Sequence, residues 1–173
     1  MKKFTVANLV LFQVLWLSCV WVAGGMGYEW AAVVAMVPLV ILACLGPART
    51  TDMAVALVAA GVGLLLDNIW VVMGLLSFTG YTLAPFWIGF LWFGVGLTLN
   101  HSMSWFRDRR VLGPIIVGLF GPITYFSGER LGAVEVERSL LLGLIALAWC
   151  ALFVLLTHLS RWMLRREQLT DMM

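Results

Sequence analysis

The chain has 173 residues, of which 62% are hydrophobic and only 12% are charged. A soluble domain averages about 25% charged residues, so this composition excludes an ordinary water-soluble globule and indicates a protein whose solvent is largely lipid. The net charge of +2 is small, and the positions of the charged residues therefore carry more information than their sum.

Six apolar segments follow one another along the chain. Each approaches the roughly 20 residues that a helix needs to cross a hydrocarbon core of about 30 Å. We therefore predict an all-α polytopic membrane protein in which residues 1–173 form a single domain, a bundle of six transmembrane helices. The predicted spans are residues 4–23, 30–46, 53–76, 86–105, 111–128 and 139–163.

The first span follows Lys2 and Lys3 and has the general appearance of a signal peptide. Its apolar stretch of about 20 residues is longer than the 7–15 residues of a typical signal-peptide core. We therefore expect this segment to be retained as the first helix.

Basic residues flank the predicted spans unequally, and the loops rich in Lys and Arg normally face the cytoplasm. Six spans with both termini cytoplasmic leave only Arg130 and Arg138 outside. The nine basic residues inside are then Lys2, Lys3, Arg49, Arg107, Arg109, Arg110, Arg161, Arg165 and Arg166. Clusters of this kind beside membrane helices anchor the topology against anionic lipid, and we expect no nucleic-acid partner.

Asp67 lies inside the third predicted span, where a charge costs about 2.5–3.5 kcal/mol on insertion scales. Helical spacing puts it on one face with Ala56, Ala60, Gly63 and Gly74. Small residues at this spacing let a neighbouring helix approach closely. Asp67 is therefore predicted to point toward the other helices and away from lipid.

The fifth predicted span contains Pro122, which removes an internal hydrogen bond of the helix. We predict that this helix is kinked or broken at Pro122. Tyr125 and Glu129 share the face of Pro122. A broken helix within a membrane is tolerated where it lines a cavity or is buried in protein.

Depth along the helices, at 1.5 Å per residue, separates the polar residues into two sets. Near the cytoplasmic end of the fourth span, the stretch TLNHS (98–102) supplies an inner pair. The outward-facing set lies toward the opposite side. The candidate ligand-binding residues are the inner pair Asn100 and His101 and the outward-facing Asp67, Asn68, Tyr125, Glu129 and Arg130.

Each of these residues also has a purely structural interpretation. Asp67 would then pair with Arg130 or cap a neighbouring helix, and Asn100 and His101 would hydrogen-bond between helices. Glu129 and Arg130 would mark a helix end that meets water. The sequence leaves both interpretations open.

No metal site or cofactor is predicted. His101 and His158 lie on different helices without a matched carboxylate cluster, and the three cysteines lack the spacing of a zinc motif. His158 is expected at the membrane interface beside Arg161.

Three stretches resemble an uncharacterised bacterial membrane family, domain of unknown function 2878. They are LLLDNIW (64–70), PFWIGFLWFGVGLTLNHSMSW (85–105) and GLFGPITYFSGERLGAV (118–134), and the resemblance extends over essentially the whole chain. The matching positions are Asp67, Pro85, Trp87, Asn100, His101, Ser102, Gly121, Pro122, Tyr125, Gly128, Arg130, Gly132 and Ala133.

The resemblance implies a protein of the inner membrane of Gram-negative bacteria, with no established activity and a frequent association with lipid-modification genes. In that family the position before Arg130 is often small. Glu129 departs from this pattern. A functional role is therefore expected more for Asp67, His101 and Arg130 than for Glu129.

The favoured hypothesis is a binding protein with an internal polar pocket for a small solute or a lipid headgroup, acting as a transport or accessory subunit. Its partners would be membrane lipid, a small-molecule or lipid ligand, and other membrane proteins. An intramembrane enzyme acting on lipid is the alternative, with His101 or Asp67 as general base, but no motif places a nucleophile beside a base. A structural scaffold for membrane enzymes is the third hypothesis.

Overall fold

A computed structural model describes residues 2–138 and 142–170. Over these residues the fold is all-α apart from one small ribbon, as predicted. The helices are α1 (Lys2–Leu17), α2 (Trp30–Cys44), α3 (Arg49–Val72), α4 (Phe86–Thr98), α5 (Ser104–Arg107), α6 (Leu112–Arg130) and α7 (Leu142–Thr170). A π-helical segment, η1 (Ser18–Gly25), continues α1, and the strands are β1 (Leu76–Phe78) and β2 (Val134–Val136).

Three helical stretches of the described chain are long and apolar enough to cross a membrane: Lys3–Gly25, Arg49–Val72 and Leu142–Leu169. Helices α2 and α4 are apolar but have only 15 and 13 residues. The structure therefore supports a membrane protein with three clear spanning helices, while the arrangement with six spans remains a prediction.

The bounds of α3 and α4 differ from those of the predicted spans. Helix α3 begins at Arg49 and not at Met53, because Asp52 in its first turn is favoured by the positive end of the helix dipole. Helix α4 ends at Thr98, well before the predicted Trp105. Polar side chains beyond this point, such as Asn100, form hydrogen bonds outside the helix, and these bonds compete with continuation of the helix. The predicted start of the sixth span, at residue 139, lies outside the described residues.

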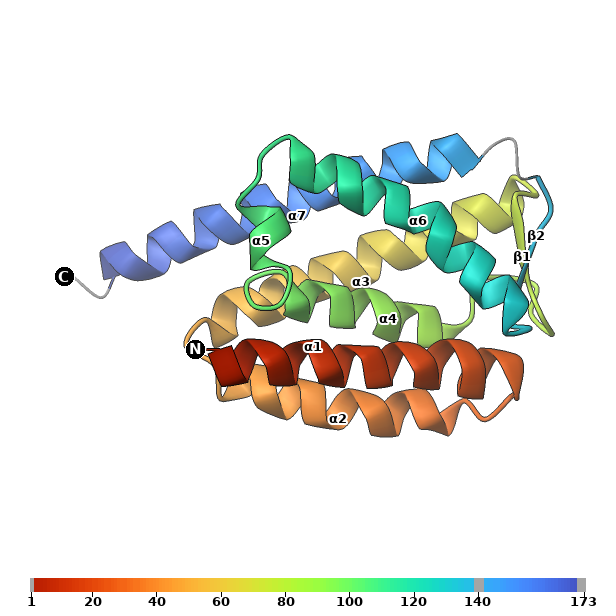
Figure 1. Cartoon of the computed structure of the whole chain (residues 1–173), viewed down its shortest axis with the longest axis horizontal. Helices are drawn as coiled ribbons and strands as arrows, with labels where there is room; N and C mark the ends of the chain where they lie inside the picture. Colours follow the sequence, from red (N-terminus) through yellow and green to blue (C-terminus); the bar gives the residue numbers. More distant parts are fainter. Residues whose placement is uncertain (1, 139–141, 171–173) are drawn as a thin grey trace.

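The helices form two groups that meet along α3 and α4 (Figure 1). Helix α1 packs against α2 and α4, α3 packs against α4 and α7, and α6 packs against α7. The start of α1 and the end of α7 lie at the same end of the molecule, and β1 and β2 lie at the opposite end (Figure 1).

Helices α3 and α4 approach each other closely at two glycines. A Cβ added to Gly96 would lie 2.4 Å from the Cα atom of Ala56, and one added to Gly63 would lie 2.2 Å from the ring of Trp92. Both distances are far below van der Waals contact, so only glycine fits there. Gly63 belongs to the small-residue face predicted for the third span, and Gly96 allows the same close approach from α4.

Helix α6 continues through Pro122 from Leu112 to Arg130. The helix is therefore not broken at this proline, and a bend there stays a prediction.

The antiparallel ribbon of β1 and β2 was not predicted. Leu76 pairs with Val136 and Phe78 with Val134, which ties the connection after α3 to the connection after α6. The third span was expected to continue to Leu76, but α3 ends at Val72 and Gly74 adopts a φ of +64°. This left-handed conformation, which glycine tolerates, turns the chain into the ribbon.

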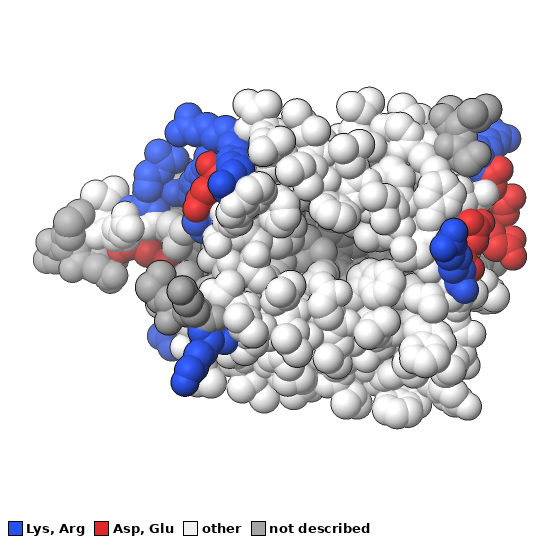
Figure 2. All heavy atoms as spheres, viewed as in Figure 1, with Lys and Arg blue, Asp and Glu red and all other residues white. Residues whose placement is uncertain are grey.

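The surface carries a broad uncharged belt. On the face shown in Figure 2, basic residues gather at the end that holds the start of α1 and the end of α7, and acidic residues gather mainly at the other end. Large apolar side chains are exposed along the helices, with Leu57 65%, Leu119 60% and Leu147 68% exposed. This distribution suits a surface that faces lipid between two aqueous interfaces.

Candidate functional site

Asp67 projects from α3 into the helix bundle and is only 1% exposed. The indole Nε1 of Trp92 on α4 donates a hydrogen bond of 2.7 Å to its Oδ2 atom. The hydroxyl of Tyr125 on α6 donates to its Oδ1 atom. A buried carboxylate is costly unless it is hydrogen-bonded, and here both oxygens accept from buried donors. The three side chains link α3, α4 and α6.

This cluster lies on the wall of a cavity of about 470 Å³. The walls come mainly from α1, α4, α6 and α7, and a hollow is visible between the surfaces of α1 and α6 in Figure 2. Most of the lining side chains are apolar or aromatic, including Phe12, Trp16, Leu91, Val117 and Trp149. The cavity is therefore chemically suited to hydrocarbon.

Trp87 gives the same cavity an unused hydrogen-bond donor. Its side chain is 1% exposed and lines the cavity, and its Nε1 atom has no hydrogen-bond partner within the described part of the chain. Buried indole N–H groups usually find a partner. A ligand in this cavity that carried an acceptor oxygen would supply one.

A second buried cluster forms around Asp52, at the opposite end of α3 from Asp67. The Nε2 atom of His101 lies 2.7 Å from one carboxylate oxygen of Asp52, and the amide of Asn100 donates a bond of 2.8 Å to the other. The amide oxygen of Asn100 accepts from Ser160 Oγ at 2.6 Å and from Arg107 Nη1 at 2.8 Å. The cluster thus joins α3, α7 and the segment between α4 and α6.

Asn8 on α1 secures the same region from the other side. Its amide donates to the carbonyl of Leu97 at 3.1 Å, and its oxygen accepts from the Ser102 hydroxyl at 2.7 Å. The last carbonyls of a helix have no partner within the helix, so Asn8 satisfies one of those at the end of α4. With the ring of Phe4 4.8 Å from that of His101, the predicted inner pair is fully engaged in contacts between helices.

The structure separates the predicted outward-facing set. Only Asp67 and Tyr125 meet, whereas Asn68 bonds to the Leu64 carbonyl at 2.8 Å and accepts from the Ala84 amide at 3.2 Å. These contacts attach the loop before α4 to α3. Asn68 does not line the cavity.

Glu129 and Arg130 lie exposed at the end of α6. Glu129 accepts from the backbone amide of Val136 at 3.0 Å and so holds β2. In the described residues the ion pairs are His101–Asp52 and Arg107–Asp108. The suggested pairing of Asp67 with Arg130 is therefore wrong.

Sequence reasoning missed Asp52, Trp87 and Trp92. The predicted third span started one residue after Asp52, which left this residue in a loop. Trp87 is among the positions that match the family, but nothing in the sequence assigned Trp87 or Trp92 to a site. A useful signal was present for Asp52, because a carboxylate and His101 lie near the same end of adjacent apolar segments.

No group of three or more His, Cys, Asp and Glu side chains suited to a metal ion occurs over residues 2–138 and 142–170. His158 is exposed on α7, and its Nδ1 atom donates to the Val154 carbonyl at 2.8 Å. It takes no part in either buried cluster.

Residues 5–155 match the family described as "Protein of unknown function (DUF2878)". Comparison with curated proteins and with solved structures finds no match.

Proposed function

The chain belongs to the DUF2878 family, and we propose that it is a membrane protein that binds the apolar part of a lipid-like molecule in the cavity between α1, α4, α6 and α7. Binding, rather than catalysis, is its activity, either as a transport component or as an accessory subunit. The observation that carries this proposal is the apolar cavity itself, with the unpaired indole donor of Trp87 in its wall.

The size and chemistry of the cavity support an amphiphile over the small solute or lipid headgroup alone that the sequence suggested. Its volume of about 470 Å³ lies within the roughly 300–1,000 Å³ of ordinary ligand pockets. Its walls favour hydrocarbon, and Trp87 Nε1 offers one hydrogen bond, which suits an ester or carboxyl oxygen.

Asp67 has a positioning role in this proposal. Both of its carboxylate oxygens are already occupied by Trp92 and Tyr125, so it fixes two side chains of the cavity wall. The ligand then meets a rigid aromatic surface whose orientation Asp67 maintains.

The cellular location is part of the proposal. The basic end of the molecule also holds the start of α1 and the end of α7 (Figures 1 and 2). Under the positive-inside rule this end faces the cytoplasm, with the protein in the inner membrane of a bacterium.

Filling the cavity tests the proposal. Val117 is 5% exposed and lines the cavity, whereas Ile115, two residues earlier on α6, is 49% exposed. We expect Val117→Phe to reduce lipid retention about tenfold, which corresponds to roughly 1.4 kcal/mol, and Ile115→Phe to leave it unchanged. Native mass spectrometry of protein purified in mild detergent measures the retained lipid.

Thr124→Phe provides a second filling variant, because Thr124 also lines the cavity. Thermal melting of each variant without added lipid checks that it is folded. Equal lipid retention by the wild type and both folded filling variants would exclude the cavity as the binding site.

A further inference from the structure

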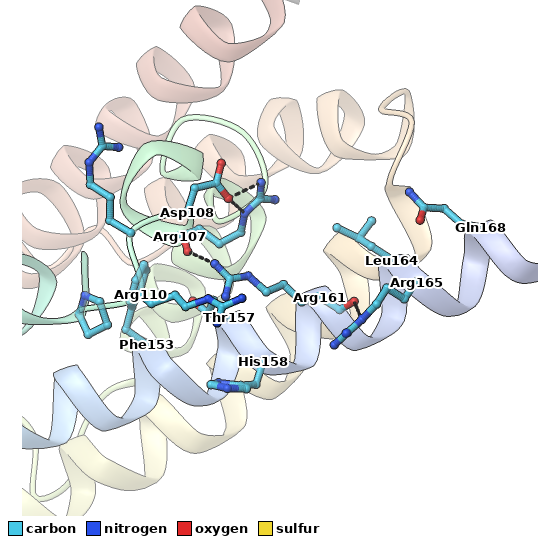
Figure 3. Close-up of a pocket in the computed structure, with 12 residues that line it drawn as sticks. Arg107, Asp108, Arg110, Phe153, Thr157, His158, Arg161, Leu164, Arg165 and Gln168 are labelled. Atoms are coloured by element: carbon cyan, nitrogen blue, oxygen red, sulfur yellow. Dashed lines mark hydrogen bonds and ion pairs between the residues drawn. The ribbon is translucent and has the colours of Figure 1, made fainter. Parts of the chain in front are cut away.

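A second pocket, here called the arginine pocket, lies between α7 and the segment that runs from α5 into α6. Its volume is about 480 Å³. Figure 3 shows Arg107, Arg110 and Arg161 gathered at this junction, with Arg165 further along α7. The charged residues that line it are Arg107, Asp108, Arg109, Arg110, Arg161 and Arg165.

The positive charge of this pocket is poorly neutralised. Arg107 pairs with the one lining carboxylate, Asp108, at 2.9 Å. Arg161 donates to the Arg107 carbonyl at 2.5 Å, and Arg165 donates to the Arg161 carbonyl at 3.2 Å. Backbone carbonyls orient a guanidinium group without cancelling its charge. Four lining arginines therefore have no lining carboxylate to pair with.

Arg109 is also held by neutral groups. It donates to the Trp105 carbonyl at 3.0 Å, and its guanidinium carbon lies 3.5 Å from the centre of the Trp105 ring. A cation over an indole face is attracted by the ring but keeps its charge. Arg107, Arg109, Arg161 and Arg165 are thus held in place before any anion arrives, which lowers the entropy cost of binding one.

Thr157 adds an independent observation. It is 6% exposed and lines the arginine pocket, and within the described residues its Oγ1 atom has no hydrogen-bond partner. Leaving a buried hydroxyl unpaired is unfavourable. An acceptor oxygen in the pocket would satisfy it.

We propose that the arginine pocket binds a phosphate group, with Arg110, Arg161 and Arg165 supplying charge and Thr157 donating a hydrogen bond. Guanidinium groups recognise phosphate oxygens through paired, charge-assisted hydrogen bonds. The phosphate belongs either to a lipid headgroup or to a soluble anion. The arginine pocket and the apolar cavity are separate sites, although Phe153 lines both.

Diffuse attraction between basic residues and anionic lipid is the competing explanation. It depends on charge alone, so every arginine at this end would contribute to a similar degree. A built site instead depends on the residues of the pocket. Arg166 provides the matched control, because it lies on α7 but lines a different pocket with Arg49 and Glu167.

The experiment uses the full chain in nonionic detergent with two probes, inorganic phosphate and micelles that contain phosphatidic acid. Phosphatidylcholine micelles serve as the neutral control. Thermal melting and native mass spectrometry follow binding. Stabilisation by inorganic phosphate identifies a soluble anion as sufficient, and binding of phosphatidic acid alone identifies the lipid headgroup.

Arg161→Gln and Thr157→Val should each weaken binding of the effective probe about tenfold, and Arg166→Gln less than about twofold. Thr157→Val removes an unpaired hydroxyl, so its melting temperature without probe should not fall. This variant therefore separates lost binding from lost folding. Absence of binding by both probes, or any pattern in which Arg166→Gln weakens binding as much as Arg161→Gln or Thr157→Val, would overturn the proposal.

Discussion

Each oxygen of the Asp67 carboxylate accepts a hydrogen bond from a side chain on a different helix, Trp92 on α4 and Tyr125 on α6. Asp52 is used in the same way at the other end of α3, where His101 and Asn100 meet it. Both of these buried carboxylates are therefore surrounded by hydrogen-bonding side chains. The polar residues that stand out in the sequence act first as links between helices.

Asp67→Ala should destabilise the protein strongly, because it leaves two buried donors without an acceptor. An unsatisfied buried group costs about 1–3 kcal/mol. Thermal or detergent-induced unfolding measures the loss, and Leu65→Ala, at a residue 60% exposed on the same helix, is the control. In a protein that already carries Tyr125→Phe, the further loss of stability caused by Asp67→Ala should be smaller than in the wild type. Strictly additive effects would mean that the two side chains do not interact.

The helices also associate through small residues. Gly96 lets the backbone of α4 reach that of α3 at Ala56, and van der Waals packing at such crossings is a main source of stability between membrane helices. The spacing of glycine and alanine predicted the contact face of α3. It did not predict which partner each glycine would meet.

Gly96→Ala should therefore destabilise the protein by about 1–3 kcal/mol, because the added methyl group meets backbone that cannot move aside. Gly89 lies on the same helix, but a Cβ there would meet the Leu64 side chain at an ordinary 3.8 Å. Gly89→Ala should be neutral or stabilising by up to about 1 kcal/mol, since alanine favours the helix. Unfolding in detergent compares the two variants, and equal effects would contradict the close crossing.

At the scale of the whole molecule, the face shown in Figure 2 has an uncharged belt between two charged ends. The start of α1 and the end of α7 share the basic end. Three helical stretches of the described chain have the length and apolar character of clear spans, and six crossings with both termini on one side stay a prediction.

Reporter fusions test this topology. A fluorescent protein at the C-terminal end should fluoresce, because that end is expected in the cytoplasm. Alkaline phosphatase inserted after Gly80, in the loop beside β1, should be active, because that loop is expected outside. Active phosphatase at the C-terminal end would show that the orientation is opposite to the one expected.

The sequence by itself determined the lipid environment, the approximate positions of the long helices, the inward direction of Asp67 and the membership of the family. These properties depend on local composition and on helical periodicity, which one stretch of chain is enough to define. The ends of α3 and α4 were less predictable, because polar side chains near them can form hydrogen bonds either within the helix or with residues distant in the chain.

Only the tertiary structure decided which polar residues meet. Asp52 and His101 are 49 positions apart in the chain, and Asp67 reaches Tyr125 while Arg130, five residues later, lies exposed. The apolar cavity, the arginine pocket and the β1–β2 ribbon likewise arise where distant segments pack together. Such contacts depend on the relative placement of whole helices, which local sequence patterns do not specify.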